Sequence, residues 1–250
     1  MEGPGSQGSR RRIRQGVLVL IFGDDVGAWN TYPQHRWIFN KLEVALRLGY
    51  DAAPIIVPVT KPGKYIIRPI YNLYGMGIGA YAKDLDPRMD FEDHVVGEPG
   101  TFWCEYFEGD HVSVDYKWVD EGKGGIHSGW RPVNAMQGVE SVHQGLFESW
   151  TRVKPELRLL PDWVEALYDV TDLNIEWIGD RIIEVHLRTG NDVIANLPLG
   201  TQLIPLWEGG PDMPDDCVFV PNEEEGRYDA SGYLPMNRLG YYMKKRYPDW

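Results

Sequence analysis

The segment from residue 172 to residue 188 constrains the fold of this chain more than any other stretch. Two short runs rich in apolar residues flank Gly179 and Asp180, a pair typical of the turn that closes a β-hairpin. Because side chains alternate between the faces of a strand, the second run divides into two sets. One face is apolar, and the other carries Ile182, Glu184, His186 and Arg188. An acid, an imidazole and a guanidinium in a row suit a metal or phosphate site, although a solvated strand face is the simpler interpretation.

Composition limits the classes of protein to which the chain can belong. Its 250 residues, 43% of them hydrophobic, are enough for one large domain or two small ones. A formal charge of −12 argues against a nucleic-acid partner, because phosphate backbones are bound by clustered Lys and Arg. Two cysteines without metal-type spacing indicate a reducing compartment, and the apolar run at 17–22 is too short to cross a bilayer. We therefore expect a cytoplasmic protein without a membrane partner, and its oligomeric state is left open.

Hydrophobic periodicity and turn residues predict the other elements. Strands are expected at 17–22, 55–59 and 65–68, and helices at 36–48 and 161–168. Residues 102–107 and 112–118 are expected to form a second hairpin, followed by a polar, Gly-rich loop over 119–132. Strand pairs mixed with helices indicate an α+β fold built on antiparallel sheets.

Three glycines, Gly75, Gly77 and Gly79, follow the predicted strand that ends at Arg68. Glycine lets backbone amides approach a phosphate, and an arginine adds charge and a fork of donors. The spacing is not that of a Walker loop or a dinucleotide fingerprint, because no helix is predicted to begin at the glycines. A flap over phosphates and an ordinary tight turn are both compatible with this pattern.

The order of these motifs along the chain resembles the ATP-grasp family. The resemblance rests on residues 65–79 with Arg68 and the glycines, on residues 104–115 (C-E-Y-F-E-G-D-H-V-S-V-D) and on residues 182–188 (I-I-E-V-H-L-R). A helix at 40–50 that carries a lysine also fits, and the likeness covers about residues 38–192. Three motifs in the family's order are more specific than any one of them.

The resemblance implies an ATP-grasp-like α+β fold, in which two subdomains with antiparallel sheets sandwich a nucleotide. In those terms residues 1–15 are a disordered basic tail. Residues 16–62 are a vestigial strand–helix segment in place of a full N-terminal Rossmann-like domain. Residues 63–107 are the lid subdomain with the glycine flap, and residues 108–200 are the core subdomain with the metal site. Residues 201–250 are a C-terminal extension packed on the core.

The resemblance also implies roles for individual residues. The catalytic residues would be Arg68, Arg188 and Glu184. The nucleotide would be bound by Lys41, Arg68, the flap residues Met76, Gly77 and Gly79, the hinge residues Glu105, Tyr106 and Phe107, and His111. The ligands of Mg²⁺ or Mn²⁺ would be Glu184, His186 and Glu176, with Asp172 as an alternative to Glu176.

Two departures from the family pattern affect the expected function. His186 stands where the family usually has a metal-binding asparagine, and an imidazole suits Mn²⁺ better than Mg²⁺. Only about fifty residues precede the flap, so we expect a shortened version of the family's architecture.

The resemblance implies an ATP-dependent ligase that activates a carboxylate as an acyl phosphate and joins it to an amine. Its partners would then be ATP and a carboxylate and amine substrate, which can be small molecules or proteins. A non-catalytic binding or assembly protein and a small-molecule kinase that uses the same site remain alternatives.

Overall fold

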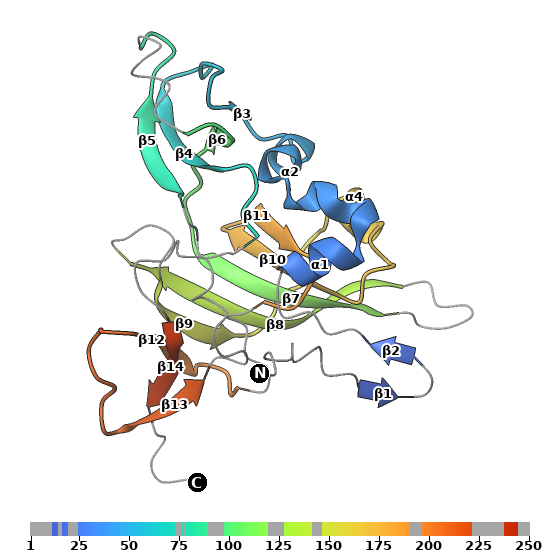
Figure 1. Cartoon of the computed structure of the whole chain (residues 1–250), viewed down its shortest axis with the longest axis vertical. Helices are drawn as coiled ribbons and strands as arrows, with labels where there is room; N and C mark the ends of the chain where they lie inside the picture. The colour runs from blue at the N-terminus through green and yellow to red at the C-terminus, as the bar shows by residue number, and fades with distance from the viewer. Residues whose placement is uncertain are drawn as a thin grey trace, which may run out of the picture.

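Two antiparallel sheets, one of four strands and one of eight, form most of the molecule (Figure 1). The computed structural model describes residues 12–14, 17–19, 25–73, 77, 79–89, 98–119, 128–141, 147–190, 197–221 and 238–244. Antiparallel sheets with few helices confirm the α+β prediction. Within the described residues, no helix combines the length and the apolar character needed to cross a membrane.

The smaller sheet has its own hydrophobic core. Its strands, in spatial order, are β3 (Ala52–Pro54), β6 (Thr101–Glu105), β4 (Gly63–Pro69) and β5 (Tyr81–Leu85). Tyr65 and Ile67 of β4 alternate with more exposed neighbours and pack against Trp103 of β6, which confirms the strand predicted at 65–68. Because β3 pairs with β6, this sheet begins before residue 63.

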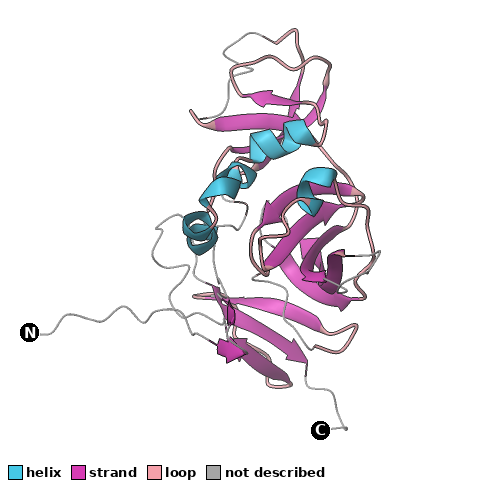
Figure 2. Cartoon of the chain, turned by 90° about the vertical axis from the view of Figure 1, so that its right-hand side faces the viewer, coloured by secondary structure: helices cyan, strands magenta, loops and turns pink. Residues whose placement is uncertain are grey.

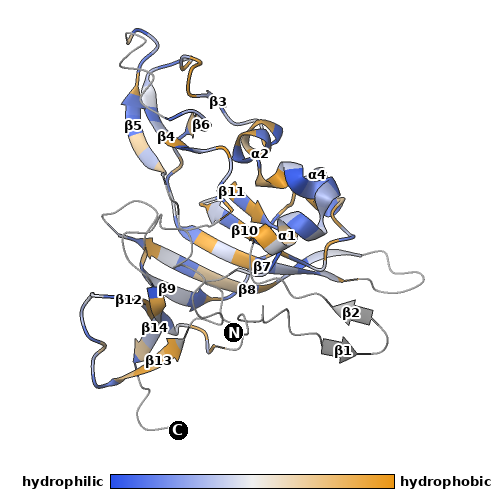
Figure 3. Ribbon diagram, in the orientation of Figure 1, coloured by the Kyte–Doolittle hydropathy of each residue, from blue (hydrophilic) through white to orange (hydrophobic). Residues whose placement is uncertain are grey.

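The larger sheet extends from the hairpin at 172–188 to the last described strand. In spatial order it contains β11 (Arg181–His186), β10 (Asp172–Ile178), β7 (His111–Val119), β8 (Gly129–Glu140), β9 (Phe147–Val153), β12 (Gln202–Trp207), β14 (Arg238–Lys244) and β13 (Cys217–Pro221). Hydrophobic residues recur along β7, β10 and β11 (Figure 3). β12 pairs with β9 and with β14, so the strands after residue 200 belong to the larger sheet and do not form a separate extension packed on it.

The helices, cyan in Figure 2, lie between the smaller sheet at the top and the larger sheet, and two of them contact β11, the edge strand of the larger sheet. They are α1 (Asp25–Thr31), the 3₁₀ helix η1 (Pro33–Phe39), α2 (Lys41–Arg47) and the short α4 (Asp162–Glu165). The single helix predicted at 36–48 is wrong. Asn40 adopts extended angles (φ −83°, ψ 94°), and its side chain caps α2 by accepting a hydrogen bond from Glu43 N at 3.0 Å.

The hairpin predicted from the Gly179-Asp180 turn is confirmed, with one irregularity. Glu176 lies opposite Glu184 and Asn174 opposite His186, but the register shifts between Glu176 and Trp177. Ile182 pairs with Trp177 and is buried in the main core with Val185 and Leu187, so the shift interrupts the strict two-residue alternation predicted for this strand.

The second predicted hairpin, over 102–118, is wrong. Its two strands are β6 and β7, and they belong to different sheets. β6 pairs with β4 and β3, whereas β7 pairs with β10 and β8. The turn-like residues Glu108, Gly109 and Asp110 therefore form the crossing between the sheets.

Two predicted boundaries and one predicted strand also differ from the structure. Residues 55–59 form a turn in which Val57 N donates to Pro54 O at 2.8 Å, although Ile55 and Val59 are buried. The proline within that run, Pro58, has no N–H to donate to a sheet ladder, which accounts for the error. The loop expected over 119–132 ends earlier, because β8 begins at Gly129, and the predicted helix at 161–168 is helical only over α4. In the tail, β1 (Arg12–Arg14) pairs with β2 (Val17–Val19).

Gly109 is expected to be the least replaceable residue of the crossing. Its φ is +134°, and a Cβ there would lie 2.9 Å from the backbone of Gly179 in the β10–β11 turn. We expect Gly109→Ala to lower the free energy of unfolding by at least 1 kcal/mol more than Gly100→Ala, which shares a positive φ but meets no atom within 4 Å. Chemical denaturation of both variants tests this, and equal losses would contradict it.

Candidate active site

A cavity lies between the two sheets and is lined by residues from both. Its described lining contains four Lys or Arg side chains and three Glu side chains, with two histidines, although the whole chain carries a charge of −12. These residues are Lys41, Arg68, Arg188 and Arg238; Glu140, Glu176 and Glu184; and His111 and His186. The described lining thus carries more Lys and Arg than Glu, in contrast to the chain as a whole, and this balance suits an anionic ligand.

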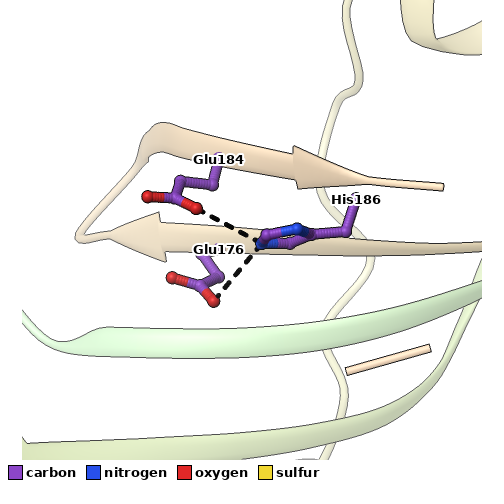
Figure 4. A group of neighbouring side chains, drawn as sticks. All are labelled: Glu176, Glu184 and His186. Carbon is purple, nitrogen blue, oxygen red and sulfur yellow. Dashed lines mark ion pairs between the residues drawn. The ribbon is translucent and has the colours of Figure 1, made fainter. Parts of the chain in front are cut away.

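Glu176, Glu184 and His186 form an acid–imidazole cluster on β10 and β11 (Figure 4). His186 Nε2 lies 3.4 Å from Glu184 Oε2 and 3.6 Å from Glu176 Oε1. One ligand atom from each residue lies within 4.8 Å of the others, so two carboxylates and an imidazole fit a divalent cation. The alternative acid, Asp172, lies 3.8 Å from Lys117 Nζ and outside this cluster.

Two cations from the side of the small sheet contact Glu184. Lys41 Nζ, at the start of α2, donates to Glu184 Oε1, and Arg68 Nη1 of β4 lies 3.3 Å from the same oxygen. Arg68 Nη2 also donates to Ile183 O at 2.8 Å. Burial alone would raise the pKa of Glu184, but Lys41, His186 and Arg68 hold that pKa well below its usual value. Glu184 is therefore an anion held between the sheets.

Asp25 supports the cluster from behind. Its carboxylate, 1% exposed, lies 3.0 Å from His186 Nδ1 and accepts hydrogen bonds from Arg188 Nε at 2.8 Å and Nη2 at 3.0 Å. Burial alone would raise the pKa of Asp25, but Arg188 and His186 lower it strongly. Because Nδ1 of His186 faces Asp25, its Nε2 is directed at Glu176 and Glu184.

Arg188 is held in the wall of the cavity. Besides its two bonds to Asp25, its Nη1 donates to Thr189 O at 2.8 Å, and the side chain is 6% exposed. Arg188 thus lines the cavity as a fixed guanidinium whose charge is shared with Asp25.

His111 lies on the other side of Glu176, at the start of β7. Its Nε2 is 3.3 Å from Glu176 Oε2 and its Nδ1 is 3.4 Å from Glu140 Oε1. Burial alone would lower the pKa of His111, but the hydrogen bonds with Glu140 and Glu176 raise it to about 9. Although burial opposes this, His111 and His186 hold the pKa of Glu176 down at about 2.

We expect loss of the His111 proton to lower the free energy of unfolding by about 2–3 kcal/mol between pH 6.5 and pH 9 in the absence of divalent cations. A pKa raised from 6.5 to about 9 means that protonated His111 stabilises the fold fully below pH 6.5 and loses this contribution as the pH rises through 9. Urea denaturation in EDTA at several pH values measures the slope. His111→Gln should make it shallower, and a wild-type stability that is flat or rises over this range would contradict the assignment.

One end of the cavity is apolar. Ile66, Cys104, Phe107, Ile178 and Ile182 line it, with Val44 and Ala45 of α2. Burial raises the pKa of the Cys104 thiol to about 12, so this side chain is an apolar wall rather than a nucleophile. A flat aromatic group such as a nucleotide base fits such a surface.

The predicted hinge residues differ in their orientation. Tyr106 and Phe107 line the cavity, and the Phe107 ring packs 4.7 Å from that of Tyr50. The Glu105 side chain instead accepts a hydrogen bond from Asp51 N at 3.1 Å, and Glu105 is not part of the described lining.

The predicted flap is described only in part. Gly77 lines the cavity together with Arg68 and has a φ of 59°, and Gly79 has a φ of 76°. A Cβ on Gly79 would lie 3.2 Å from Pro69 Cγ, so glycine is needed for both conformation and space. Gly75 and Met76 lie outside the described residues.

The polar residues of the site that were not predicted include Asp25, Glu140, Asn174 and Arg238. Asn174 could have been found, because it shares a strand face with Glu176; its amide donates to Ser113 Oγ at 2.9 Å and Asp115 Oδ1 at 3.0 Å. Asp25 lies 161 residues from His186, and no local pattern connects the two.

Sequence comparison and structural comparison give different results. No family model and no curated protein sequence matches the chain. Among solved structures, an L-amino acid ligase from Bacillus licheniformis is similar at 12% identity and a TM-score of 0.38, over 63% of this chain and 42% of that one. A putative ATP-grasp superfamily protein from Archaeoglobus fulgidus is similar at 13% identity and a TM-score of 0.39, over 75% of this chain and 62% of that one.

A third similar structure covers more of the chain. An N5-carboxyaminoimidazole synthase from Aspergillus clavatus, in complex with ADP and 5-aminoimidazole ribonucleotide, matches at 9% identity and a TM-score of 0.48. The alignment covers 89% of this chain and 74% of that one, whereas the chain spans less than two thirds of the first two proteins. The interpretation of the site below depends on the contacts described above and not on these likenesses.

Proposed function

We propose that the chain is an ATP-dependent ligase that activates a carboxylate as an acyl phosphate and joins it to an amine. The observation that carries this proposal is the meeting of Lys41 and Arg68 with Glu184 inside the cavity between the sheets. The cations would bind the negatively charged phosphates of a nucleoside triphosphate, and the carboxylate–imidazole cluster would bind the divalent cation that accompanies it.

The contacts of Lys41 and Arg68 with Glu184 explain how these charged groups can be buried together. Lys41 and Arg68 lie close to Glu184, each about one-eighth exposed or less, and each would be costly to bury alone. When metal-bound ATP binds, phosphate oxygens would replace Glu184 as the partners of Lys41 and Arg68. The divalent cation would then bind the carboxylates of Glu176 and Glu184. The ion pairs therefore hold the site in a form that metal-bound ATP can enter.

The apolar end supports a nucleotide rather than inorganic phosphate. Ile66, Phe107 and Ile182 offer apolar surface to a base in the same cavity as the cations that would bind its phosphates. Both features line the same cavity, which fits a ligand with a flat apolar group and a polyanionic tail.

In the proposed reaction, a substrate carboxylate oxygen attacks the γ-phosphorus of ATP, and the bond between that phosphorus and the bridging oxygen breaks to release ADP. The amine nitrogen then attacks the acyl carbon, phosphate leaves with the electron pair of the C–O bond, and the amine loses one proton. Lys41 and Arg68 neutralise negative charge on the transferring group, and Arg188, fixed by Asp25, orients it.

Glu176, Glu184 and His186 are the residues that would hold a divalent cation. When bound, the cation would neutralise phosphate oxygens and polarise the phosphoryl group. In the proposed reaction the residues that line the cavity would exclude bulk water, because water hydrolyses acyl phosphates. His186 favours Mn²⁺ over Mg²⁺, since Mg²⁺ prefers oxygen ligands.

Trapping with hydroxylamine tests the proposal. The protein is incubated with ATP, Mn²⁺ or Mg²⁺, hydroxylamine and pools of amino acids or dicarboxylic acids, and hydroxamate and ADP are measured. We expect both products to appear together and to require the acid. ADP formed without any acid, or no ADP with any pool and either metal, would contradict the proposed ligase.

A further inference from the structure

We infer that the cavity contains a second binding site, for a substrate in which a carboxylate is attached to a planar apolar body. This site, here called the aromatic end, consists of Phe147 and Trp150 of β9, Trp207 of β12 and Arg238 of β14. The inference deepens the proposed function, because it names the class of substrate that would meet the nucleotide.

Strand register places the aromatic end on the same sheet face as the acid–imidazole cluster. Residues directly opposite each other in antiparallel strands share a face. His111 lies opposite Gly138, Gly138 opposite Trp150, and Trp207 opposite Arg238. The cavity therefore continues from the cluster on β10 and β11, past His111, to the aromatic end on β9, β12 and β14.

Gly138 makes room for the aromatic wall. A Cβ on this residue would lie 2.5 Å from the Phe147 ring and 2.9 Å from the Trp150 ring. The two ring centroids are 4.2 Å apart with 34° between their planes, and the His111 ring lies 4.8 Å from Phe147. A side chain at 138 would push these rings off β8, so glycine keeps a broad apolar surface beside His111.

Arg238 supplies a fixed positive charge at this surface. It is 6% exposed yet lines the cavity, its Nη1 donates to Tyr241 Oη, and its guanidinium lies 4.6 Å from the Tyr241 ring centroid. A guanidinium held in this way is preorganised for a carboxylate, which it can bind through two parallel hydrogen bonds. Rings that stack on the substrate and a guanidinium that binds its acid together define the ligand class.

Probe binding in the absence of nucleotide tests the site. Calorimetry or tryptophan fluorescence gives the Kd of 3-phenylpropionate, of 3-phenylpropan-1-ol and of 2-phenylethylamine. We expect the acid to bind at least tenfold more tightly than the alcohol, since hydrogen bonds to a charged group contribute that much, and the amine to bind most weakly. Equal affinities for the acid and the alcohol, or no binding of the acid, would overturn the inference.

Variants locate the probe. Arg238→Met should weaken binding of 3-phenylpropionate at least tenfold, Arg238→Lys should weaken it less, and Gly138→Ala should weaken all the phenyl probes by displacing the rings. Arg88→Met removes an arginine that is 83% exposed and should change nothing. Unchanged binding in both Arg238 variants would overturn the inference. If Arg238→Met fails to fold, two other measurements test the inference. They are the ratio of the Kd values for the acid and the alcohol in the wild type, and the affinity of Arg238→Lys for 3-phenylpropionate.

The same samples separate this inference from the proposed function. ATP binding with Mn²⁺ depends on Lys41, Arg68 and the cluster, so Arg238→Met should retain it. Loss of probe binding with retained ATP binding supports both ideas. A chain that binds 3-phenylpropionate through Arg238 but never binds ATP contradicts only the proposed ligase, and the reverse result contradicts only the aromatic end.

Discussion

Asp25→Asn should lower the free energy of unfolding by about 3–5 kcal/mol. The substitution keeps the shape of the side chain but removes the charge that Arg188 and His186 share in a site where Asp25 is 1% exposed. Arg188 and His186 then lose the negative charge of Asp25 in a buried site, so keeping both side chains positively charged becomes more costly. Urea denaturation at pH 7 without divalent cations measures the change.

Asp169→Asn is the matched control for this prediction. Asp169 also pairs with a histidine, His35, at 2.8 Å, but its side chain is 41% exposed, so the loss should stay below about 1 kcal/mol. A double variant, Asp25→Asn with Arg188→Met, should lose less than the sum of the single losses, because it also removes the buried positive charge that Asp25 neutralises. Equal losses for Asp25→Asn and Asp169→Asn would refute the role given to Asp25.

Glu184→Gln should reduce ATP turnover at least 100-fold while leaving the affinity for metal-free ATP unchanged or higher. Glutamine cannot supply the anionic oxygen that the metal site needs, so the stabilisation of the transferring phosphoryl group is lost. The same substitution releases Lys41 and Arg68 from their shared partner, and both cations become available to phosphates.

ADP formation and ATP binding in EDTA, measured on one preparation, separate these two effects. Glu148→Gln, which removes an exposed glutamate from β9, is the control and should match the wild type in both. A merely structural role for Glu184 would lower binding and turnover together, and unchanged turnover would exclude Glu184 from the site.

The parts of the fold that local sequence patterns determine could be predicted. The hairpin at 172–188 depends on a two-residue turn and on alternation within a few residues, and it brings Glu184, His186 and Glu176 together as expected. The segment 102–118 shows the same local signals, but β6 and β7 find partners in distant strands. Long-range pairing overrides a local turn preference there, and short-range patterns do not encode it.

The charged residues around the site also depend on long-range packing that short sequence patterns do not encode. Asp25 and Arg238 come from opposite ends of the chain. Only the packing of α1 brings Asp25 to His186 and Arg188, and only the packing of β14 brings Arg238 to the cavity. The face of Glu176 depends on the hairpin register, which the structure supplies. Lys41 and Arg68 were placed by family resemblance, and their shared contact with Glu184 is a property of the folded chain.

Calorimetric titration of the protein with ATP, in the presence and absence of Mn²⁺, tests the central claim most directly. We predict one nucleotide per chain, tighter binding with Mn²⁺ than in EDTA, and at least a 100-fold loss of affinity in a Lys41→Met, Arg68→Met double variant that retains its fold. Absence of nucleotide binding by the folded wild-type chain, or unchanged affinity in the double variant, would contradict a nucleotide site between the two sheets.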